Sequence, residues 1–311
     1  MSGRGGDGRV SVVGLRVALV GPGKVGSSLA RWLLARGAEV GVVARRTGAS
    51  LPRWAVAAGA RAARVEELAT GDCDLLLIAV PDAAVEAVAA ALAARPQAPV
   101  ALHTSGLLTA EALAPLRRAG TAVGGLHPLR AFPRPLPSLT FASRTFFAVQ
   151  GDPPAVELAS RIASAFGAPH AEVTGQARPL YHLAATWAAG GAVTLLGAAV
   201  DLHARAAVDA AAAGGLAELA RGALAAVVDP ASPVVSLTGP LVRGEASYLD
   251  QLAALREAFP ELHPLAVLVA LEGLRQLAER GPLSIAQEAV RSALREVCEQ
   301  PSFLDPLRDR V

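Results

Sequence analysis

The sequence predicts an α/β N-terminal domain, built on a doubly wound parallel sheet, followed by an all-α C-terminal domain. Short β-branched segments alternate with alanine-rich helical stretches between about residues 15 and 150, which is the pattern of parallel strands wound with helices. After about residue 174 the strand pattern stops, and from Pro179 onward the periodicity is helical. We therefore expect a disordered tail over residues 1–13, the α/β domain over 14–174 and the helical domain over 175–311.

Six segments of the N-terminal part have the composition of buried strands, and each is followed by a turn or a helical stretch. These segments cover residues 16–21, 38–44, 74–80, 99–105, 121–127 and 145–151. In the C-terminal part the helical pattern is interrupted at residues 227–235 and 238–247, where proline and glycine gather. The N-terminal part therefore predicts the sheet, and the C-terminal part predicts several helices with two breaks.

Composition excludes several classes of protein. The 311 residues are 52% hydrophobic and 18% charged with a net charge of +2, and they contain no dense run of lysine or arginine, so we expect no nucleic-acid partner. The N-terminus lacks the apolar segment of a signal peptide, which predicts a cytoplasmic protein. The uncharged stretch Leu183–Val200 barely reaches the length of a membrane span, and we interpret it as a buried core helix. Cys73 and Cys298 lack metal-ligand spacing, so we expect buried free thiols and no metal.

A glycine-rich turn between the first strand and the first helix carries the strongest signal. Gly21, Gly23 and Gly26 form a G-x-G-x-x-G pattern, in which the first glycine permits a tight turn, the second admits a pyrophosphate and the third allows close helix packing. Backbone N–H groups at the start of the helix then hold the phosphates. The α/β domain is therefore expected to be a Rossmann-like dinucleotide-binding domain. We assign further cofactor contacts to residues of this turn and of two later strand ends: Lys24, Val25, Val80, Pro81 and Thr104.

The end of the second strand indicates which dinucleotide is bound. NAD-binding folds usually have an acidic residue here for the ribose 2′-hydroxyl, whereas a 2′-phosphate favours arginine. The sequence has Arg45 and Arg46 at this place and no carboxylate, so we expect NADP as the cofactor. The alternative is that both arginines are simply solvated at a strand end.

Polar side chains follow other strands at the edge where doubly wound sheets bind ligands. His103, Thr104 and Ser105 end one strand and His127 ends the next, so the two histidines either share a polar site or are structural. Ser105 lacks the pattern of a nucleophile elbow, which argues against acyl transfer. Asp82 opens a helix and is most simply its N-cap.

Tyr181 and His182 stand side by side near the start of an apolar helix that Pro179 opens. Because every face of this helix is apolar as far as Val200, we expect it to be buried at the centre of its domain. Burying both polar groups without partners would cost about a few kcal/mol, so they need partners or a ligand.

Four motifs in this order give the chain a family resemblance: "HTSG", "GLHPLRAF", "YHLAATWAAGG" and "LTGPLVRGE". Over residues 14–300 it resembles bacterial oxidoreductase-like proteins that join a Rossmann-like domain to a conserved helical domain of unknown function. These are distantly similar to pyrroline-5-carboxylate reductase, ketopantoate reductase and prephenate dehydrogenase. The resemblance implies a nicotinamide-dependent reductase of a small keto or imino acid, whose helical domain closes the site and usually dimerises.

The chain also departs from the family pattern. Arg178 stands where the family has a lysine, and because arginine keeps its proton it can position an anion without relaying protons. Gly190 replaces an asparagine, Glu245 replaces an aspartate and a later histidine is missing. Lys24 is the only lysine in the chain, which excludes a lysine acid or Schiff base elsewhere. Arg243 either caps a helix C-terminus or holds a substrate carboxylate.

These residues predict an NADP(H)-dependent oxidoreductase that acts on a small carboxylated substrate. We expect His182 or Tyr181 to donate the proton, Ser105 and His127 to orient the reacting group, and Arg243 or Arg178 to bind the carboxylate, with His103 nearby. The alternative is a catalytically decayed NADP-binding sensor or scaffold, which Gly190 and the missing lysine favour. The long apolar helices predict a homodimer under either hypothesis.

Overall fold

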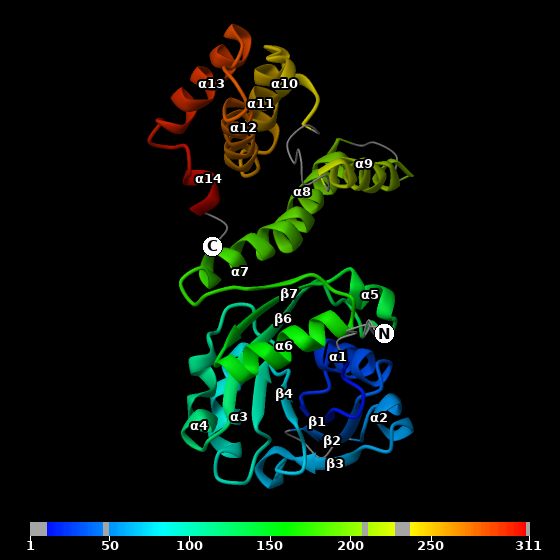
Figure 1. Cartoon of the computed structure of the whole chain (residues 1–311). Helices are drawn as coiled ribbons and strands as arrows, with labels where there is room; N and C mark the ends of the chain where they lie inside the picture. Colours follow the sequence, from blue (N-terminus) through cyan, green and yellow to red (C-terminus); the bar gives the residue numbers. More distant parts are fainter. Residues whose placement is uncertain (1–10, 46–49, 207–210, 228–236, 309–311) are drawn as a thin grey trace, which may run out of the picture. The chain divides into compact units, whose positions relative to one another are not determined.

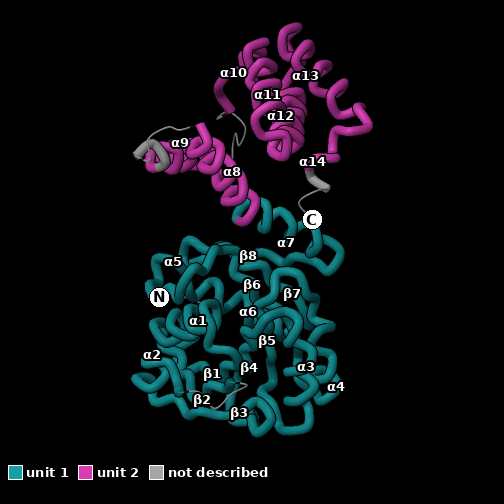
Figure 2. The backbone as a smooth tube through the Cα atoms, turned by 180° about the vertical axis from the view of Figure 1, so that it is seen from behind, with its two compact units in different colours: residues 1–189 teal, residues 190–311 magenta. Residues whose placement is uncertain are grey.

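The computed structural model describes residues 11–45, 50–206, 211–227 and 237–308. The chain divides into two compact units, residues 1–189 and 190–311, which Figure 2 shows in different colours. Arg46 and most of the expected tail lie outside the described residues. Helix α7, which the sequence analysis placed in the helical domain, is part of the first unit.

An eight-stranded sheet forms the centre of the first unit (Figure 1). Its strands lie in the order β3-β2-β1-β4-β5-β6-β7-β8, and all neighbours are parallel except β6 and β7. The sheet is thus mostly parallel, which confirms the predicted fold class, and β7 with its parallel partner β8 runs against the other strands. The strands are β1 (Arg16–Val20), β2 (Glu39–Arg45), β3 (Arg61–Arg64), β4 (Leu75–Ile78), β5 (Val100–His103), β6 (Ala122–Leu129), β7 (Phe146–Gly151) and β8 (His170–Glu172).

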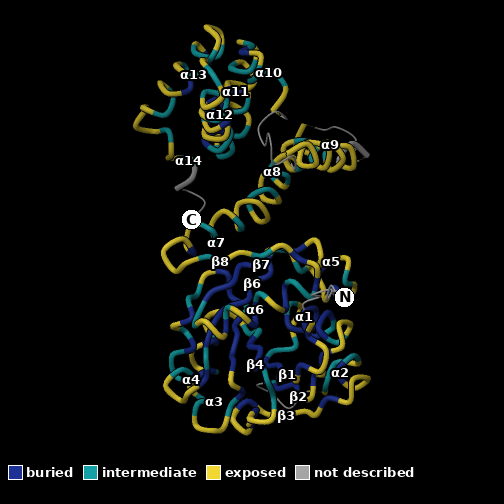
Figure 3. The backbone as a smooth tube through the Cα atoms, viewed as in Figure 1, coloured by how far each residue is buried: buried dark blue, intermediate teal, exposed yellow. Residues whose placement is uncertain are grey.

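Helices cover both faces of this sheet because successive strand residues point to opposite sides. In β1, Val17 and Leu19 pack into a core with α1 and α6, whereas Ala18 and Val20 pack into a second core with α3, η2 and α4. Figure 3 shows the strands as the buried part of this unit. The helical segments are α1 (Lys24–Leu34), α2 (Arg53–Ala57), η1 (Val65–Glu67), α3 (Asp82–Leu92), η2 (Ala110–Leu113), α4 (Ala114–Arg118), α5 (Leu139–Ser143), α6 (Pro153–Ala165) and α7 (Arg178–Thr186).

The described part of the second unit is helical. Its core is a small apolar cluster on α11, α12 and α13, centred on Leu252, Val267 and Leu294. Ser284 and Gln287 form a capping box that starts α13, and Gly244, at φ +67°, ends α10 in the left-handed conformation. The helices are α8 (Ala192–Arg205), α9 (Ala211–Val227), α10 (Pro240–Arg243), α11 (Ser247–Ala258), α12 (His263–Ala278), α13 (Ile285–Cys298) and α14 (Asp305–Arg308).

The helical run from Arg178 to Arg205 corrects one expectation. It consists of α7, a π-helical turn η3 (Trp187–Gly191) and α8, and its large apolar side chains are exposed, including Leu180 at 73%, Trp187 at 69% and Val193 at 70%. The sequence analysis expected a buried helix because every face is apolar, but apolarity alone does not say what covers a helix. The run is also long and apolar enough to span a membrane, by length and composition only.

Two smaller expectations also need correction. Asp82 is the first residue of α3 and not its N-cap, which is Pro81, and its carboxylate makes no capping hydrogen bond. Cys73 and Cys298 are free thiols, as expected, but both are only partly buried.

Candidate functional site

The turn between β1 and α1 has the geometry that the three glycines predict. A Cβ on Gly21, whose φ is +89°, would lie 2.5 Å from the carbonyl oxygen of Ala79, and one on Gly26 would lie 2.2 Å from that of Gly21. A Cβ on Gly23, by contrast, would meet no atom within 4 Å. The outer glycines are thus required for close packing, while the middle one leaves open space at the N-terminus of α1. A phosphate fits such a place because the free N–H groups point toward it.

A groove of about 460 Å³ begins at this turn and runs across the carboxyl ends of β1, β2 and β4. Half of the residues assigned to the cofactor line this groove, namely Gly21, Gly23, Arg45, Val80 and Pro81. Lys24 and Val25 begin α1, next to the groove. Thr104 follows β5, and its N–H donates to the carbonyl oxygen of Ile78 in β4, which ties its loop to the neighbouring strand.

Arg45 is the last residue of β2 and lines this groove. Rossmann-like folds hold the adenosine ribose near the end of this strand. Nη1 of Arg45 donates a hydrogen bond to the carbonyl oxygen of Ser50, 2.7 Å away, which holds the guanidinium near the end of β2. The register of β2 and β3 places Arg64 directly beside Arg45. Sequence analysis missed Arg64, because a four-residue edge strand gives no pairing signal.

A second cavity, of about 560 Å³, opens where β6 ends and α7 begins. Its polar lining comes from His127, Arg130, Tyr181, His182 and Thr186. The hydroxyl of Tyr181 is 2.8 Å from Nδ1 of His127, and the two rings meet edge to face. The ring of His182 lies 6.2 Å from that of His127, measured between centroids. The structure thus brings three of the predicted catalytic residues into one cavity.

Gly106 lies directly beneath the two imidazole rings. A Cβ at this position would be 2.6 Å from Nδ1 of His182 and 2.8 Å from Nε2 of His127. Both rings therefore pack on the bare backbone of the loop after β5. The Nδ1 atom of His182 is buried there without a hydrogen-bond partner in the described structure.

Arg178 is fully buried below this layer. Its Nη2 donates to the carbonyl oxygen of Ser105 at 2.7 Å, while Nε and Nη1 are buried without a partner in the part of the chain that the structure describes. Burial lowers the pKa of this guanidinium, but arginine stays charged in proteins. Arg178 forms no ion pair with the described residues, although the charge of Asp82 acts on it from a greater distance. Its positive charge also acts on the groups around it, including His127.

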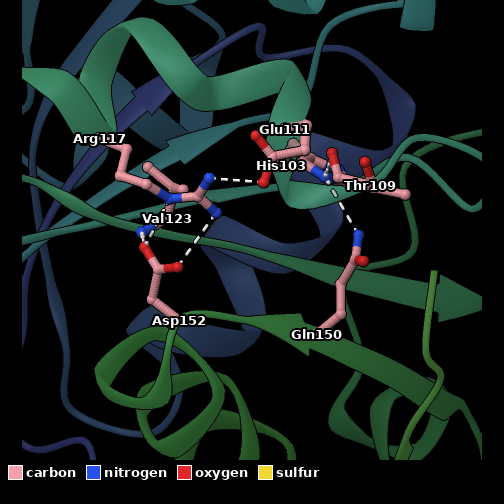
Figure 4. A network of polar contacts seen from close by, with 7 residues as sticks. All are labelled: His103, Thr109, Glu111, Arg117, Val123, Gln150 and Asp152. Carbon is pink, nitrogen blue, oxygen red and sulfur yellow. Dashed lines mark hydrogen bonds and ion pairs between the residues drawn. The ribbon is translucent and has the colours of Figure 1, made fainter.

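His103 and Ser105 hold the loop and do not face the cavity. Nδ1 of His103 accepts from the N–H of Ser105 at 3.2 Å, and Nε2 lies 3.2 Å from the carbonyl oxygen of Thr109. The Ser105 hydroxyl oxygen accepts from the N–H groups of Leu107 and Leu108. Figure 4 shows His103 with Thr109 and Gln150, beside an Arg117 that bridges Glu111 and Asp152. Sequence alone could not separate these internal roles from contacts with a substrate.

The surroundings of His127 keep its imidazole neutral. Burial, followed by the nearby charge of Arg178, lowers the pKa of His127 to about 3, and the same causes lower the pKa of His103 to about 4. Burial raises the pKa of Tyr181 to about 12, although the charge of Arg178 acts in the opposite direction. At neutral pH the Tyr181–His127 pair therefore carries a phenol and a neutral imidazole.

Arg130 is a cavity residue that sequence analysis overlooked. Its Nε donates to the Thr145 hydroxyl at 2.6 Å and its Nη2 donates to the carbonyl oxygen of Arg144, so the guanidinium is held at the cavity wall. The available signal was its place in "GLHPLRAF", three residues after His127 at the end of the same strand.

Arg243 belongs to the second unit and forms an ion pair with Glu245, its neighbour in the same turn. Both side chains are largely exposed. Gly244 ends the helix in the left-handed conformation, so the turn needs no arginine cap. Over the described residues there is also no group of three or more His, Cys, Asp or Glu side chains arranged to hold a metal.

Comparisons with known proteins agree with the fold. Residues 16–102 match the family described as NADP oxidoreductase, coenzyme F420-dependent, and residues 145–266 match a domain of unknown function, DUF2520. No curated protein matches the sequence.

Three solved structures share the fold. A Thermotoga maritima protein is 21% identical, with a TM-score of 0.70 over 85% of this chain and 98% of that one. A Bacteroides fragilis protein assigned to the NADP oxidoreductases is 18% identical, with a TM-score of 0.68 over 85% and 99%. The NADP-bound pyrroline carboxylate reductase of Plasmodium falciparum is 11% identical, with a TM-score of 0.54 over 82% and 95%.

The buried histidines predict how stability depends on pH. Because the pKa values of His103 and His127 are lowered in the folded state, the unfolded chain binds protons first as the pH falls below about 6.5. We expect the first unit to lose roughly 2 kcal/mol per histidine between pH 6.5 and pH 5. Urea unfolding followed by tryptophan fluorescence measures this loss, since Trp32, Trp54 and Trp187 all lie in the first unit.

The variant His127→Gln should retain only about half of this pH dependence, because one of the two proton sites is gone. The carboxylates of Asp74 and Asp152 do not contribute to the change in stability between pH 6.5 and pH 5, because their pKa values are lowered and they titrate below this range. A free energy of unfolding that stays constant from pH 7 to pH 5 would contradict the assignment.

Proposed function

We propose that the chain, whose residues 16–102 match the NADP oxidoreductase (coenzyme F420-dependent) family and whose residues 145–266 match DUF2520, is an NADP(H)-dependent oxidoreductase. The proposed reaction moves a hydride between the nicotinamide and a C=O or C=N carbon of a small carboxylated substrate. One observation carries the proposal: the glycine-lined groove and the histidine–tyrosine cavity lie along the same carboxyl edge of neighbouring strands β1, β4, β5 and β6. Ligands of doubly wound sheets bind at this edge.

NADP is the cofactor that suits the groove. The open space above Gly23 can receive the pyrophosphate, and Arg45 is placed for the 2′-phosphate, with Arg64 beside it and Arg46 next in sequence. The bound cofactor supplies or accepts the hydride, while the protein orients the substrate and stabilises developing charge. Val80 and Pro81 line the groove after β4, and Thr104 follows the neighbouring strand β5, where its N–H bonds to the carbonyl oxygen of Ile78.

The cavity supplies the remaining parts of the proposed reaction. Tyr181 and His182 are the candidate proton donors, and His127 orients the Tyr181 hydroxyl through their hydrogen bond. We propose Arg130 for the substrate carboxylate, because its guanidinium lines the cavity. Arg178, proposed from sequence for this task, is too deeply buried to touch a substrate, and Arg243 is paired with Glu245. His103 and Ser105 act on the loop beneath.

A decayed sensor or scaffold is the second candidate. Gly190, in the position of the family asparagine, contributes no side chain to the turn η3, and Arg178 cannot relay a proton in place of the lysine. A cofactor-binding protein without turnover would keep the groove and lose the need for the cavity. The ordered Tyr181–His127 pair favours the enzyme.

Turnover and the role of Arg130 can be tested together. We expect the protein to oxidise NADPH with at least one member of a panel of small keto and imino acids that includes ketopantoate and pyrroline carboxylate. The variant Arg130→Met should raise KM for that substrate by about 10- to 100-fold, as expected for loss of a charged hydrogen bond, without changing the Kd for NADPH.

Arg144→Met is the matched control, because Arg144 contributes only its carbonyl oxygen to this wall. Tight NADPH binding by the wild type without turnover on any substrate would support the sensor instead.

The glycine turn gives a test of the cofactor site. We expect Gly23→Ala to fold normally, since its Cβ meets no atom, but to weaken NADPH binding about tenfold or more by filling the phosphate space. Gly26→Ala should also destabilise the first unit, because its Cβ would overlap the Gly21 carbonyl. Nucleotide fluorescence titration and tryptophan-detected unfolding measure both effects.

Gly41→Ala serves as the control for these variants, since Gly41 is exposed in β2 and has open space around its Cβ. Equal NADPH affinity in Gly23→Ala and the wild type would contradict the proposed phosphate position.

The exposed apolar side chains of α7, α8 and α9 support a homodimer, and we propose that this homodimer is cytoplasmic. The exposed fractions of Leu180, Leu183, Val193 and Leu219 are 46–73% in the single chain, which is unusual for helices of a soluble fold. We propose that a second copy covers them, in preference to a lipid bilayer.

Light scattering should give twice the 31.6 kDa chain mass, and Leu180→Glu with Val193→Glu should halve it. Val13→Glu, at another exposed apolar position, is the control and should leave the mass unchanged. A wild-type monomer, or sedimentation of the protein with phospholipid vesicles, would contradict the dimer.

A further inference from the structure

The cavity also favours one kind of substrate over another, an inference that rests on the proposed function. We propose that the site takes a carbonyl substrate, a 2-keto acid or the corresponding 2-hydroxy acid, and does not reduce imines. We further propose that Gly106 and Arg178 are positioning residues, which fix His182 as a hydrogen-bond donor through its Nε2–H. Neither residue touches the substrate.

The packing on Gly106 decides which nitrogen of His182 carries the proton. Nδ1 is buried against the Gly106 backbone and has no acceptor among the described atoms. A proton on Nδ1 would therefore be an unsatisfied buried donor, which costs about 1–3 kcal/mol. A lone pair on Nδ1 is less costly, because the cationic guanidinium of Arg178 lies just below, bonded to the preceding residue Ser105. The proton therefore sits on Nε2, the other nitrogen of a ring that lines the cavity.

The charges around the cavity suit an oxygen that becomes negative. Arg178 contributes a buried positive charge without an ion-pair partner in the described chain, and Arg130 contributes a second at the wall. The described lining of the cavity contains no Asp or Glu. During hydride transfer to a carbonyl the oxygen gains negative charge, and fixed donors and cations stabilise it. A protonated imine would instead bring a positive charge into this field, and Asp82, the carboxylate whose charge acts on Arg178, is not among the residues that line the cavity.

The proton donor of the cavity also favours a carbonyl substrate. NADPH bound in the groove would supply the two electrons as a hydride to the carbonyl carbon, and the π electrons of the C=O bond would move to the oxygen. That oxygen then takes the proton of the Tyr181 hydroxyl, and the tyrosinate recovers a proton from water. Tyr181 has a pKa of about 12, still below the 15.7 of water, so it can protonate an alkoxide. An imine must be protonated before it accepts hydride, and a phenol with a pKa of about 12 is too weak an acid for that step.

Steady-state kinetics with NADPH test the substrate class. We expect pyruvate, 2-ketoisovalerate or another 2-keto acid to be reduced with a kcat/KM at least about 100-fold above that of pyrroline-5-carboxylate and piperideine-2-carboxylate. Imine reduction at an equal or higher kcat/KM would overturn this inference while leaving the oxidoreductase proposal intact. Absence of turnover with both classes would overturn the proposed function together with the substrate class.

Nitrogen NMR of the imidazoles tests the positioning residues without any turnover. In the ¹⁵N-histidine-labelled full chain we expect a non-protonated Nδ1 and a protonated Nε2 for His182, assigned by comparison with His182→Gln. Gly106→Ala should disturb this pattern and lower kcat, whereas the control Gly41→Ala should change neither. NADPH affinity shows whether Gly106→Ala is folded. A wild-type His182 with its proton on Nδ1 would overturn the role of Gly106 and Arg178 even if keto acids are substrates.

Discussion

The hydrogen bond from the buried guanidinium of Arg178 to the carbonyl oxygen of Ser105 fixes the candidate site, because it joins the first turn of α7 to the loop after β5. One turn further along α7, Tyr181 and His182 then lie over His127 and Gly106. A buried cation with a single hydrogen bond carries a desolvation penalty of several kcal/mol. Such a group is a candidate for function, since a neutral side chain would serve packing at a lower cost.

The strand pattern predicted the sheet well where strands are long and apolar. All six expected segments contain a strand. The two apolar cores, one on each face of the sheet, follow from the alternation of side chains in β1. The short edge strands β3 and β8 were missed, because three or four exposed residues show no periodicity. The reversed direction of β7 was also beyond prediction, since the proline-rich connection after β6 does not show which way the chain returns.

The candidate site was predictable in its residue types and less so in their roles. His127 was identified because ligands of this fold bind at the carboxyl ends of strands. Tyr181 and His182 were identified because Pro179 marks the first turn of an apolar helix, where polar side chains need a partner or a ligand. Sequence could not show that His103 and Ser105 turn inward to hold their own loop. It also gave no sign that Gly106 admits two imidazole rings, because that closeness arises only from the tertiary packing.

We propose that the glycine-lined groove and the histidine–tyrosine cavity serve one reaction. A crystal structure of the protein with NADP⁺ and a substrate analogue tests this most directly. The account predicts the pyrophosphate above Gly23 and the nicotinamide C4 facing the cavity of His127, Tyr181 and His182, with the reacting carbon about 3–3.5 Å away. A nicotinamide ring that points away from this cavity would contradict it.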